Sequence, residues 1–345
     1  MPDGLVVATD TDGRFELQPA HGDAPPPPRP SPAATFTARR NAFLREGPTR
    51  CVLLLHAQSP TATPRAMHEA TALRALDRVF ECPAPHLQLD LEGDDPLDAW
   101  DVLRTIVETA RRRAQLTGRR LSIGLTTNLA AMSEARGAWL LQHGVMLRVP
   151  FDAMEALHTA QRALTGAAPF AVAARWIERL HALAAVRGVD ATGAYLNATL
   201  TLSRHATDFG PEQLVDACLR AGLRYVRLCP VDPVGLDPEL HRAHALPARD
   251  FAAFHARFVD EALRRTLGGE LLVEMRLALA LERVLDRSPA PDRPRVACGN
   301  GSPTLAFAAD GSVYTCAAAT RLGDAAEQDV RDEPTVTLDE RWAEL

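Results

Sequence analysis

The chain has 345 residues, of which 46% are hydrophobic, enough for one large α/β domain with small appendages. A formal net charge of −6 gives no basic footprint for nucleic acid. No run approaches the roughly 18 apolar residues of a membrane span, and the acidic start MPDGLVVATDTDG is unlike a signal peptide, so we expect a cytoplasmic protein with no membrane partner. All 38 basic residues are arginine, which excludes a Schiff-base lysine and a P-loop lysine.

The N-terminal part is expected to form a small module that is separate from the main body. Alternating residues on both sides of an Asp-Gly turn predict a β-hairpin over Leu5–Gln18, within a module of residues 1–20. Residues 21–45 contain HGDAPPPPRPSPAA and predict a stiff linker. This linker could act as a spacer or as a ligand for a proline-recognition domain.

Residues 46–286 alternate between strand and helix patterns. The expected strands are Cys51–His56, Leu87–Leu91, Leu121–Thr127, Val145–Phe151, Tyr195–Ser203 and Tyr225–Cys229. The expected helices are Arg65–Phe80, Pro96–Gln115, Met132–Gln142, Phe170–Val186, Pro211–Ala221, Ala248–Leu267 and Leu271–Leu285. Six such repeats with short links predict an α/β fold with parallel strands, as a partial (β/α)6 barrel that is open on one side. An open doubly wound sheet is the alternative, and either fold places its working face at the carboxyl ends of the strands.

The C-terminal region, residues 287–345, begins with a second Pro-rich stretch. The segment TLAFAADGSVYTC then predicts a hairpin around Asp310-Gly311. Cys298 and Cys316 flank this hairpin, and the residues after Cys316 are polar.

The stretch HLQLDLEGDDPLD, residues 86–98, combines a buried strand with an acidic turn. Gly93 permits an unusual backbone angle, and Pro96 suits the first turn of a helix. Asp94 and Asp95 lie where α/β proteins bind ligands. They could instead only complement the dipole of the helix that follows.

Four motifs, in this order, carry a resemblance to a known family. The turn Gly93-Asp94-Asp95-Pro96-Leu97 resembles a GGEPL sequence, and the third strand ends in Thr127-Asn128-Leu129. The spacing of Asp152, His158 and Arg162 resembles D-G-P-x-x-x-H-x-x-x-R, with Ala153 and Met154 in place of Gly-Pro. The Cys298–Cys316 hairpin resembles the opening of a SPASM domain. Residues of roughly 40–320 thus resemble the radical S-adenosylmethionine (SAM) peptide maturases with a C-terminal SPASM domain, most closely those of the His-Xaa-Ser system.

The resemblance implies a radical SAM-like barrel with a truncated SPASM-like hairpin, and S-adenosylmethionine and a [4Fe–4S] cluster as cofactors. It implies a peptide substrate or a partner maturase protein. The implied cofactor-binding residues are Gly93, Asp94, Asp95, Thr127 and Asn128. Asp152, His158 and Arg162 correspond to a substrate or structural motif, and Cys298 and Cys316 to metal ligands.

The sequence departs from the family at the sites of both cofactors. The loop after the first strand, HAQSPTATPRAMH, has no cysteine where the family has CxxxCxxC, while Cys51 precedes it and Cys82 follows the next helix. Asp95 is one methylene shorter than Glu, and Asp94 replaces a glycine. Pro150 stands where the family often has Ser, and it lacks a hydroxyl and an N–H.

Three hypotheses follow from these departures. The first is a degenerate radical SAM-like protein that no longer carries out radical chemistry and acts as a partner or scaffold in a peptide-modification locus. The second is an active radical SAM enzyme in which remote cysteines such as Cys51 and Cys82 hold the cluster. The third is an unrelated α/β enzyme that uses Asp94, Asp95, Asp152 and His158 for acid–base chemistry.

Simpler explanations remain open for several of these residues. His56 and His68 could bind a metal or only satisfy hydrogen bonds. Asp152 could be a helix N-cap, and His158 with Arg162 a surface pair four residues apart. Cys298 and Cys316 could be a vestige of a cluster, a disulfide, or part of a zinc site completed by other ligands.

Overall fold

The computed structural model describes a long central part of the chain and several shorter segments. The described residues are 5–9, 15–19, 50–56, 66–82, 84–162, 169–189, 194–231, 238–278, 281, 304–314, 317 and 328–329. Near the N-terminus, strands β1 (Leu5–Thr9) and β2 (Phe15–Pro19) pair antiparallel, which confirms the predicted hairpin.

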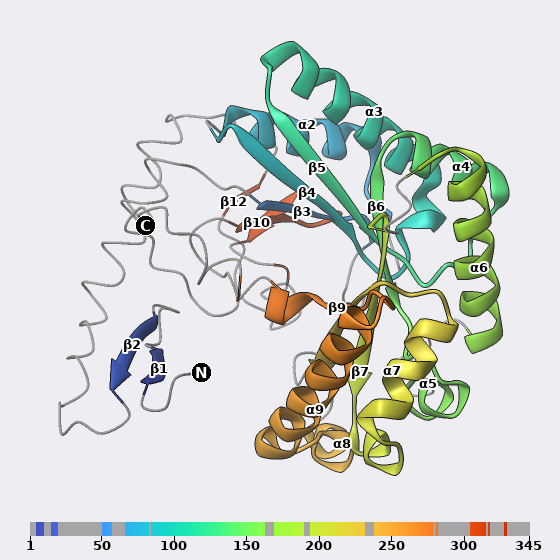
Figure 1. The fold of residues 1–345 in the computed structure, drawn as a ribbon. Coiled ribbons are helices and arrows are strands. Elements are labelled where there is room, and N and C mark those ends of the chain that lie inside the picture. Colours follow the sequence, from blue (N-terminus) through green and yellow to red (C-terminus); the bar gives the residue numbers. More distant parts are fainter. Residues whose placement is uncertain are drawn as a thin grey trace.

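The main body is a curved sheet with helices along its outside (Figure 1). Its central strands are β3 (Arg50–Leu54), β4 (His86–Glu92), β5 (Arg120–Thr126), β6 (Val145–Pro150), β7 (Leu196–Leu202) and β8 (Tyr225–Pro230). These strands pair in chain order and all in parallel, so the predicted α/β partial barrel is confirmed. Because the strands are parallel, the loops after β3 to β8 gather at one end of the barrel.

Helices connect these strands, and most of them bury one apolar face against the sheet. They are α2 (Glu69–Glu81), α3 (Trp100–Thr117), α4 (Glu134–Gln142), α5 (Glu155–Arg162), α6 (Phe170–Val186), α7 (Pro211–Arg220), α8 (Pro238–His244) and α9 (Ala248–Leu267), with the 3₁₀ helices η1 (Pro96–Ala99) and η2 (Arg204–Asp208). Of these, α8 has no buried residue. In α3 the buried residues Leu103, Ile106, Val107 and Ala110 recur at helical spacing, and this explains why the segment is a helix. Gly118 ends α3 in the left-handed conformation, at φ 64°.

The two faces of the sheet differ in chemistry. Alternate residues such as Leu53, Leu89, Leu125 and Leu147 join the helices in the large hydrophobic core. The residues between them therefore point to the concave face. Much of that face is polar.

The edges of the sheet were not predicted. Strand β9 (Val273–Glu274) pairs with β8. The sequence predicted a helix over Leu271–Leu285, and residues 275–278 are helical. The predicted helix was therefore wrong at its start. At the other edge, β10 (Thr304–Phe307) pairs in parallel with β3, and β11 (Ser312–Tyr314) pairs antiparallel with β10. The predicted C-terminal hairpin thus forms and extends the barrel sheet. Strand β12 (Gln328–Asp329) lies beyond β11.

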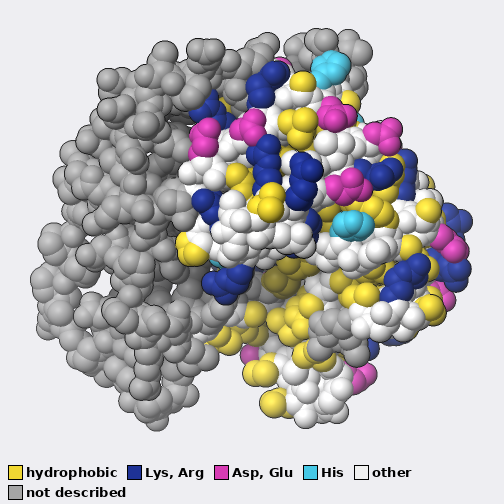
Figure 2. Space-filling model, turned by 90° about the horizontal axis from the view of Figure 1, so that it is seen from above, with side chains coloured by type: hydrophobic (Ala, Val, Ile, Leu, Met, Phe, Trp, Pro, Cys, Tyr) yellow, Lys and Arg dark blue, Asp and Glu magenta, His cyan; other side chains and the backbone are white. Residues whose placement is uncertain are grey.

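Positive and negative side chains lie side by side on the surface that Figure 2 shows. Elsewhere in the described structure, ion pairs form between or within helices, such as Arg113 with Asp77 and Arg104 with Glu108. Within the described part of the chain, no helix is long and apolar enough to cross a membrane.

Candidate functional site at the carboxyl ends of the strands

The mouth of the barrel is formed by the loops after β3, β4, β5 and β6. The loop after β3 begins at His56, which pairs with Ala66, and Leu55 donates its N–H to the carbonyl of Glu92. The N–H of Thr127 bonds the carbonyl of Arg148. These backbone bonds fix neighbouring loops to each other, so residues far apart in the sequence meet at one edge of the sheet.

Asp95 is held inside the acidic turn after β4. Its carboxylate accepts hydrogen bonds from the N–H of Leu97, at 3.1 Å, and from the hydroxyl of Thr127, at 2.9 and 3.1 Å. The side chain is 5% exposed, and burial raises its pKa above the ordinary value. Asp95 therefore caps η1 and joins the turn to the end of β5, as the helix-terminus explanation predicted.

Gly93 and His56 pack against each other at the same mouth. Gly93 has a φ of 146°, and a Cβ atom there would lie 3.2 Å from the N atom of His56. His56 is 9% exposed, and its Nδ1 is buried without a hydrogen-bond partner among the residues that the structure describes. Asp94 is exposed beside them. The glycine thus lets the first two loops approach closely, and its φ is the unusual backbone angle that the sequence predicts.

Thr127 and Asn128 shape the loop after β5. The hydroxyl of Thr127 accepts a bond from the N–H of Leu129, and Asn128 Oδ1 accepts one from the N–H of Ala130, at 2.8 Å. Leu129 has a φ of 66° and is fully buried. Both polar side chains therefore stabilise their own loop.

Asp152 and His158 form a buried pair after β6. His158 Nδ1 lies 3.1 Å from Asp152 Oδ2, and Asp152 Oδ1 accepts a hydrogen bond from the N–H of Thr201 in β7. The two side chains are 0% and 2% exposed. This pair ties β6, β7 and α5 together and does not face solvent, so it is poorly placed for acid–base chemistry on a substrate. The backbone of Arg162 ends α5, and its side chain lies outside the described atoms.

An ion network occupies the concave face below the mouth. Asp90 in β4 is fully buried, with Arg50 Nε at 2.5 Å from one oxygen and an Arg148 amino group at 2.7 Å from the other. Burial opposes ionisation of Asp90, but the guanidinium groups of Arg148 and Arg50 outweigh it and lower its pKa. Arg148 reaches Asp90 across β5 because Gly124 has no side chain: a Cβ there would lie 2.7 Å from the guanidinium.

The fold of this chain is similar to the folds of several solved structures. No protein-family model matches the sequence, and no curated protein is similar to it. The chain is similar to anSMEcpe with bound AdoMet (15% identity, 86% of this chain and 80% of that one, TM-score 0.64). It is also similar to Streptococcus suis SuiB bound to the precursor peptide SuiA (12% identity, 94% and 72%, TM-score 0.60). These neighbours are radical SAM/SPASM peptide maturases.

This chain has their fold. At such low identity the similarity concerns the fold alone. Whether the chain can hold the cofactors of radical SAM proteins therefore depends on its own residues.

The described residues do not fit a [4Fe–4S] cluster. Such a cluster takes thiolate ligands, and the loop after β3 has none in its sequence. Among the residues that the structure describes, no three His, Cys, Asp or Glu side chains are grouped as metal ligands. Cys298 and Cys316, the predicted metal ligands, lie outside the described residues.

The turn after β4 is the one to which the resemblance assigns SAM. Gly93 has the unusual backbone angle that the sequence predicts, but both oxygens of Asp95 already accept internal hydrogen bonds. Pro150 ends β6 without an N–H or a hydroxyl to offer. The residues present therefore offer fewer free polar groups at the mouth than the resemblance implied.

The sequence analysis missed the network of Asp90, Arg50 and Arg148. Two signals could have indicated it. Asp90 and Arg148 occupy the non-core positions of alternating strands, and Gly124 interrupts the strand between them. An isolated glycine in a strand often marks a close approach of other groups.

Proposed function

We propose that this chain is a radical SAM/SPASM maturase-like protein of a peptide-modification system, similar to His-Xaa-Ser systems, that has lost the cluster and serves as a partner or scaffold in the cytoplasm. In this role the barrel binds a peptide or a partner maturase protein without radical chemistry. The fold of its neighbours supports the peptide part, since SuiB and anSMEcpe were solved with peptides.

The position of Cys51 and Cys82 carries the proposal. Cys51 lies near the start of β3 and Cys82 directly after α2, so both are at the amino end of the strands. His56, where the missing cluster loop begins, is five residues beyond Cys51, or about 16 Å along a strand. Both cysteines belong to the hydrophobic core, and burial raises the pKa of each thiol.

The positions of Cys51 and Cys82 argue against the hypothesis that these two cysteines hold the cluster of an active radical SAM enzyme. A thiolate must bond to iron directly, and a cluster that uses Cys51 and Cys82 would lie in the apolar core between sheet and helices, away from the loops that would hold SAM. The acid–base alternative is opposed by the burial of Asp95, Asp152 and His158.

The test is anaerobic purification and reconstitution with iron and sulfide, followed by iron and acid-labile sulfide analysis, and calorimetry with SAM on the same sample. We expect sub-stoichiometric iron, no absorbance band near ~400 nm and no heat of SAM binding. A Cys51→Ala/Cys82→Ala variant serves as the control. A stoichiometric cluster with iron-dependent SAM binding would refute the proposal, and its loss in the variant would identify the ligands.

A further inference from the structure

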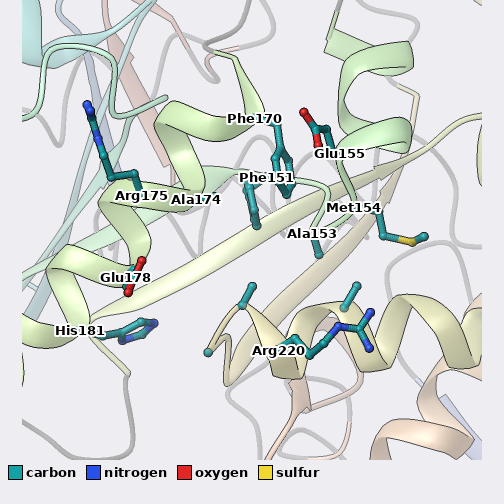
Figure 3. Close-up of a pocket in the computed structure, with 13 residues that line it drawn as sticks. Phe151, Ala153, Met154, Glu155, Phe170, Ala174, Arg175, Glu178, His181 and Arg220 are labelled. Atoms are coloured by element: carbon teal, nitrogen blue, oxygen red, sulfur yellow. The ribbon is translucent and has the colours of Figure 1, made fainter.

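A groove lies on the outside of the barrel, between α6 and α7 (Figure 3). Its volume is about 840 Å³. Phe151, at the end of β6, and Phe170, at the start of α6, stack at its floor with ring centroids 5.0 Å apart. Ala174 of α6 and Ala221 after α7 line its walls, so the walls carry little bulk.

Charged residues of α6 and α7 form ion pairs with neighbouring helices on one side of each helix, but Glu178 and Arg220, on the side that faces the groove, form none within the described part of the chain. Away from the groove, Arg179 of α6 pairs with Glu134 of α4, and Glu212 of α7 pairs with Arg257 of α9. At the groove, Glu178 of α6 and Arg220 of α7 are exposed, and neither has an ion-pair partner within the described part of the chain. The ion pairs that connect neighbouring helices elsewhere are thus missing across this gap.

His181 adds an unused polar atom at the lower end of the groove. Its Nδ1 lies 2.5 Å from the hydroxyl of Tyr195, while its Nε2 is buried and has no hydrogen-bond partner in the described part of the chain. Burial and the nearby Arg224 lower the pKa of His181 below its ordinary value. Figure 3 shows His181 and Arg220 on opposite sides of the groove.

The lining of the groove fits one face of a helix. An apolar floor with charged rims is the usual anatomy of a protein interface, and a helix recognised in a groove presents apolar residues at i, i+3, i+4 and i+7.

We propose that this groove binds an amphipathic helix of another polypeptide, with its apolar face on Phe170, Ala174 and Ala221. A basic side chain on one flank would pair with Glu178, and an acidic side chain on the other with Arg220. The partner thereby supplies at the groove ion pairs of the kind that α6 makes with α4 and α7 makes with α9. This inference does not depend on the absence of a cluster.

The test uses four fluorescein-labelled 14-residue peptides and the full chain, with binding followed by fluorescence anisotropy. Three share a leucine face at i, i+3, i+4 and i+7 and carry mixed Glu/Lys, all-Lys or all-Glu flanks; the fourth is a scrambled version of the mixed peptide. We expect the wild-type chain to prefer the mixed peptide. Arg220→Glu should shift the preference to the all-Lys peptide by about fivefold, and Glu178→Arg to the all-Glu peptide, as expected for exposed ion pairs.

Two further variants test whether peptide binding depends on the groove itself. Ala221→Trp fills the groove and should abolish binding of all helical peptides, with thermal unfolding measured to verify the fold. Arg112→Glu, an exposed charge reversal on α3, is the matched control and should change nothing beyond a general charge effect.

Several outcomes would overturn the proposal. They are equal binding of the scrambled peptide, no binding of any peptide at millimolar concentration, and an effect of Arg220→Glu no larger than that of Arg112→Glu. A dimer of the chain that Ala221→Trp dissociates would assign the groove to a second copy instead. Binding of 1-anilinonaphthalene-8-sulfonate that no peptide displaces would make it a small-molecule pocket.

Discussion

The hydroxyl of Thr127 donates to both carboxylate oxygens of Asp95, and this contact joins the loops after β4 and β5. Leu97 donates its N–H to the same carboxylate. In the family that the sequence resembles, this turn belongs to the SAM site. Here the acid is satisfied within the protein, so its first role is to hold the turn.

Replacing Asp95 tests that role. Asp95→Ala removes the cap of η1 and leaves the Thr127 hydroxyl without its acceptor, and we expect a loss of about 1–2 kcal/mol of stability. Asp95→Asn keeps an acceptor oxygen and should cost much less. Denaturant unfolding at pH 7 measures both, and equal losses for the two variants would contradict the capping role.

The pH dependence of these variants has a defined sign. Because burial raises the pKa of Asp95, its protonated form is favoured in the folded state, and its contribution to stability falls as pH rises through that raised pKa. Asp95→Asn should therefore gain stability relative to wild type as pH increases from about 4 to 7. A difference that stays constant with pH would show that Asp95 ionises as easily in the folded as in the unfolded chain.

Gly124 is required by the ion pair that crosses β5. In Gly124→Ala the new methyl group would lie 2.7 Å from the Arg148 guanidinium and 2.8 Å from Asp90 Oδ1. Because separating a buried pair leaves Asp90 poorly compensated, we expect a loss of about 3 kcal/mol or more. In an Arg148→Ala background the same substitution should cost much less, and an equal cost in both backgrounds would show that the methyl group disturbs something else.

The dependence of stability on acidic pH should report the ion network of Asp90, Arg50 and Arg148. The pKa of Asp90 is lowered, so its contribution is present above its ordinary pKa of about 3.9 and is lost as pH falls through the lower folded value. Asp90→Asn should thus be less stable than wild type at pH 7, and the difference should shrink at low pH. Urea unfolding at pH 7 and pH 3 measures this change, and Arg104→Ala, which removes an exposed pair, is the control with an expected loss below about 0.5 kcal/mol.

Much of the fold could be predicted because its pattern is local. The helix over Phe170–Val186 and the strand over Leu87–Leu91 follow from periodicity and end signals in their own residues. The start of the predicted helix Leu271–Leu285 was wrong for a non-local reason. Glu274 is 5% exposed and accepts the N–H groups of Leu228 and Leu277, so β8 imposes a strand there.

For the candidate site, the sequence predicted only where its residues lie along the strands and loops. The sequence placed Asp95 and Thr127 at neighbouring strand ends, but it could not show that they bond to each other. The sequence indicates a possible helix N-cap at Asp152, but the hydrogen bond that Asp152 accepts from Thr201 of β7 depends on the tertiary fold. Spacing reveals which loops meet, while the direction of each side chain depends on packing.

Ala153 occupies the position of a glycine in the resembling motif and has a left-handed backbone conformation. Its φ is 62°, which is costly for a residue with a Cβ atom. Ala153→Gly should therefore stabilise the chain by about 0.5–1 kcal/mol. Leu129→Gly is the matched contrast at φ 66°: relief of strain there is outweighed by the loss of a fully buried side chain, with an expected cost of about 2–4 kcal/mol. A destabilised Ala153→Gly variant would indicate that the buried methyl group matters more than the backbone.

Thiol labelling can locate the described cysteines relative to solvent. Cys51, Cys82 and Cys218 are fully buried, and burial raises the pKa of each thiol, whereas Cys229 is partly exposed beside Arg276. Because the thiolate is the reactive form, iodoacetamide at pH 7.5 should modify Cys229 in the native chain. It should reach the three buried cysteines only after unfolding in urea. Mass spectrometry of proteolytic peptides gives the modified positions. Rapid labelling of Cys51 and Cys82 in the native chain would mean that both thiols can leave the core. A cluster held by these cysteines requires such exposure, so this result would favour the active-enzyme hypothesis.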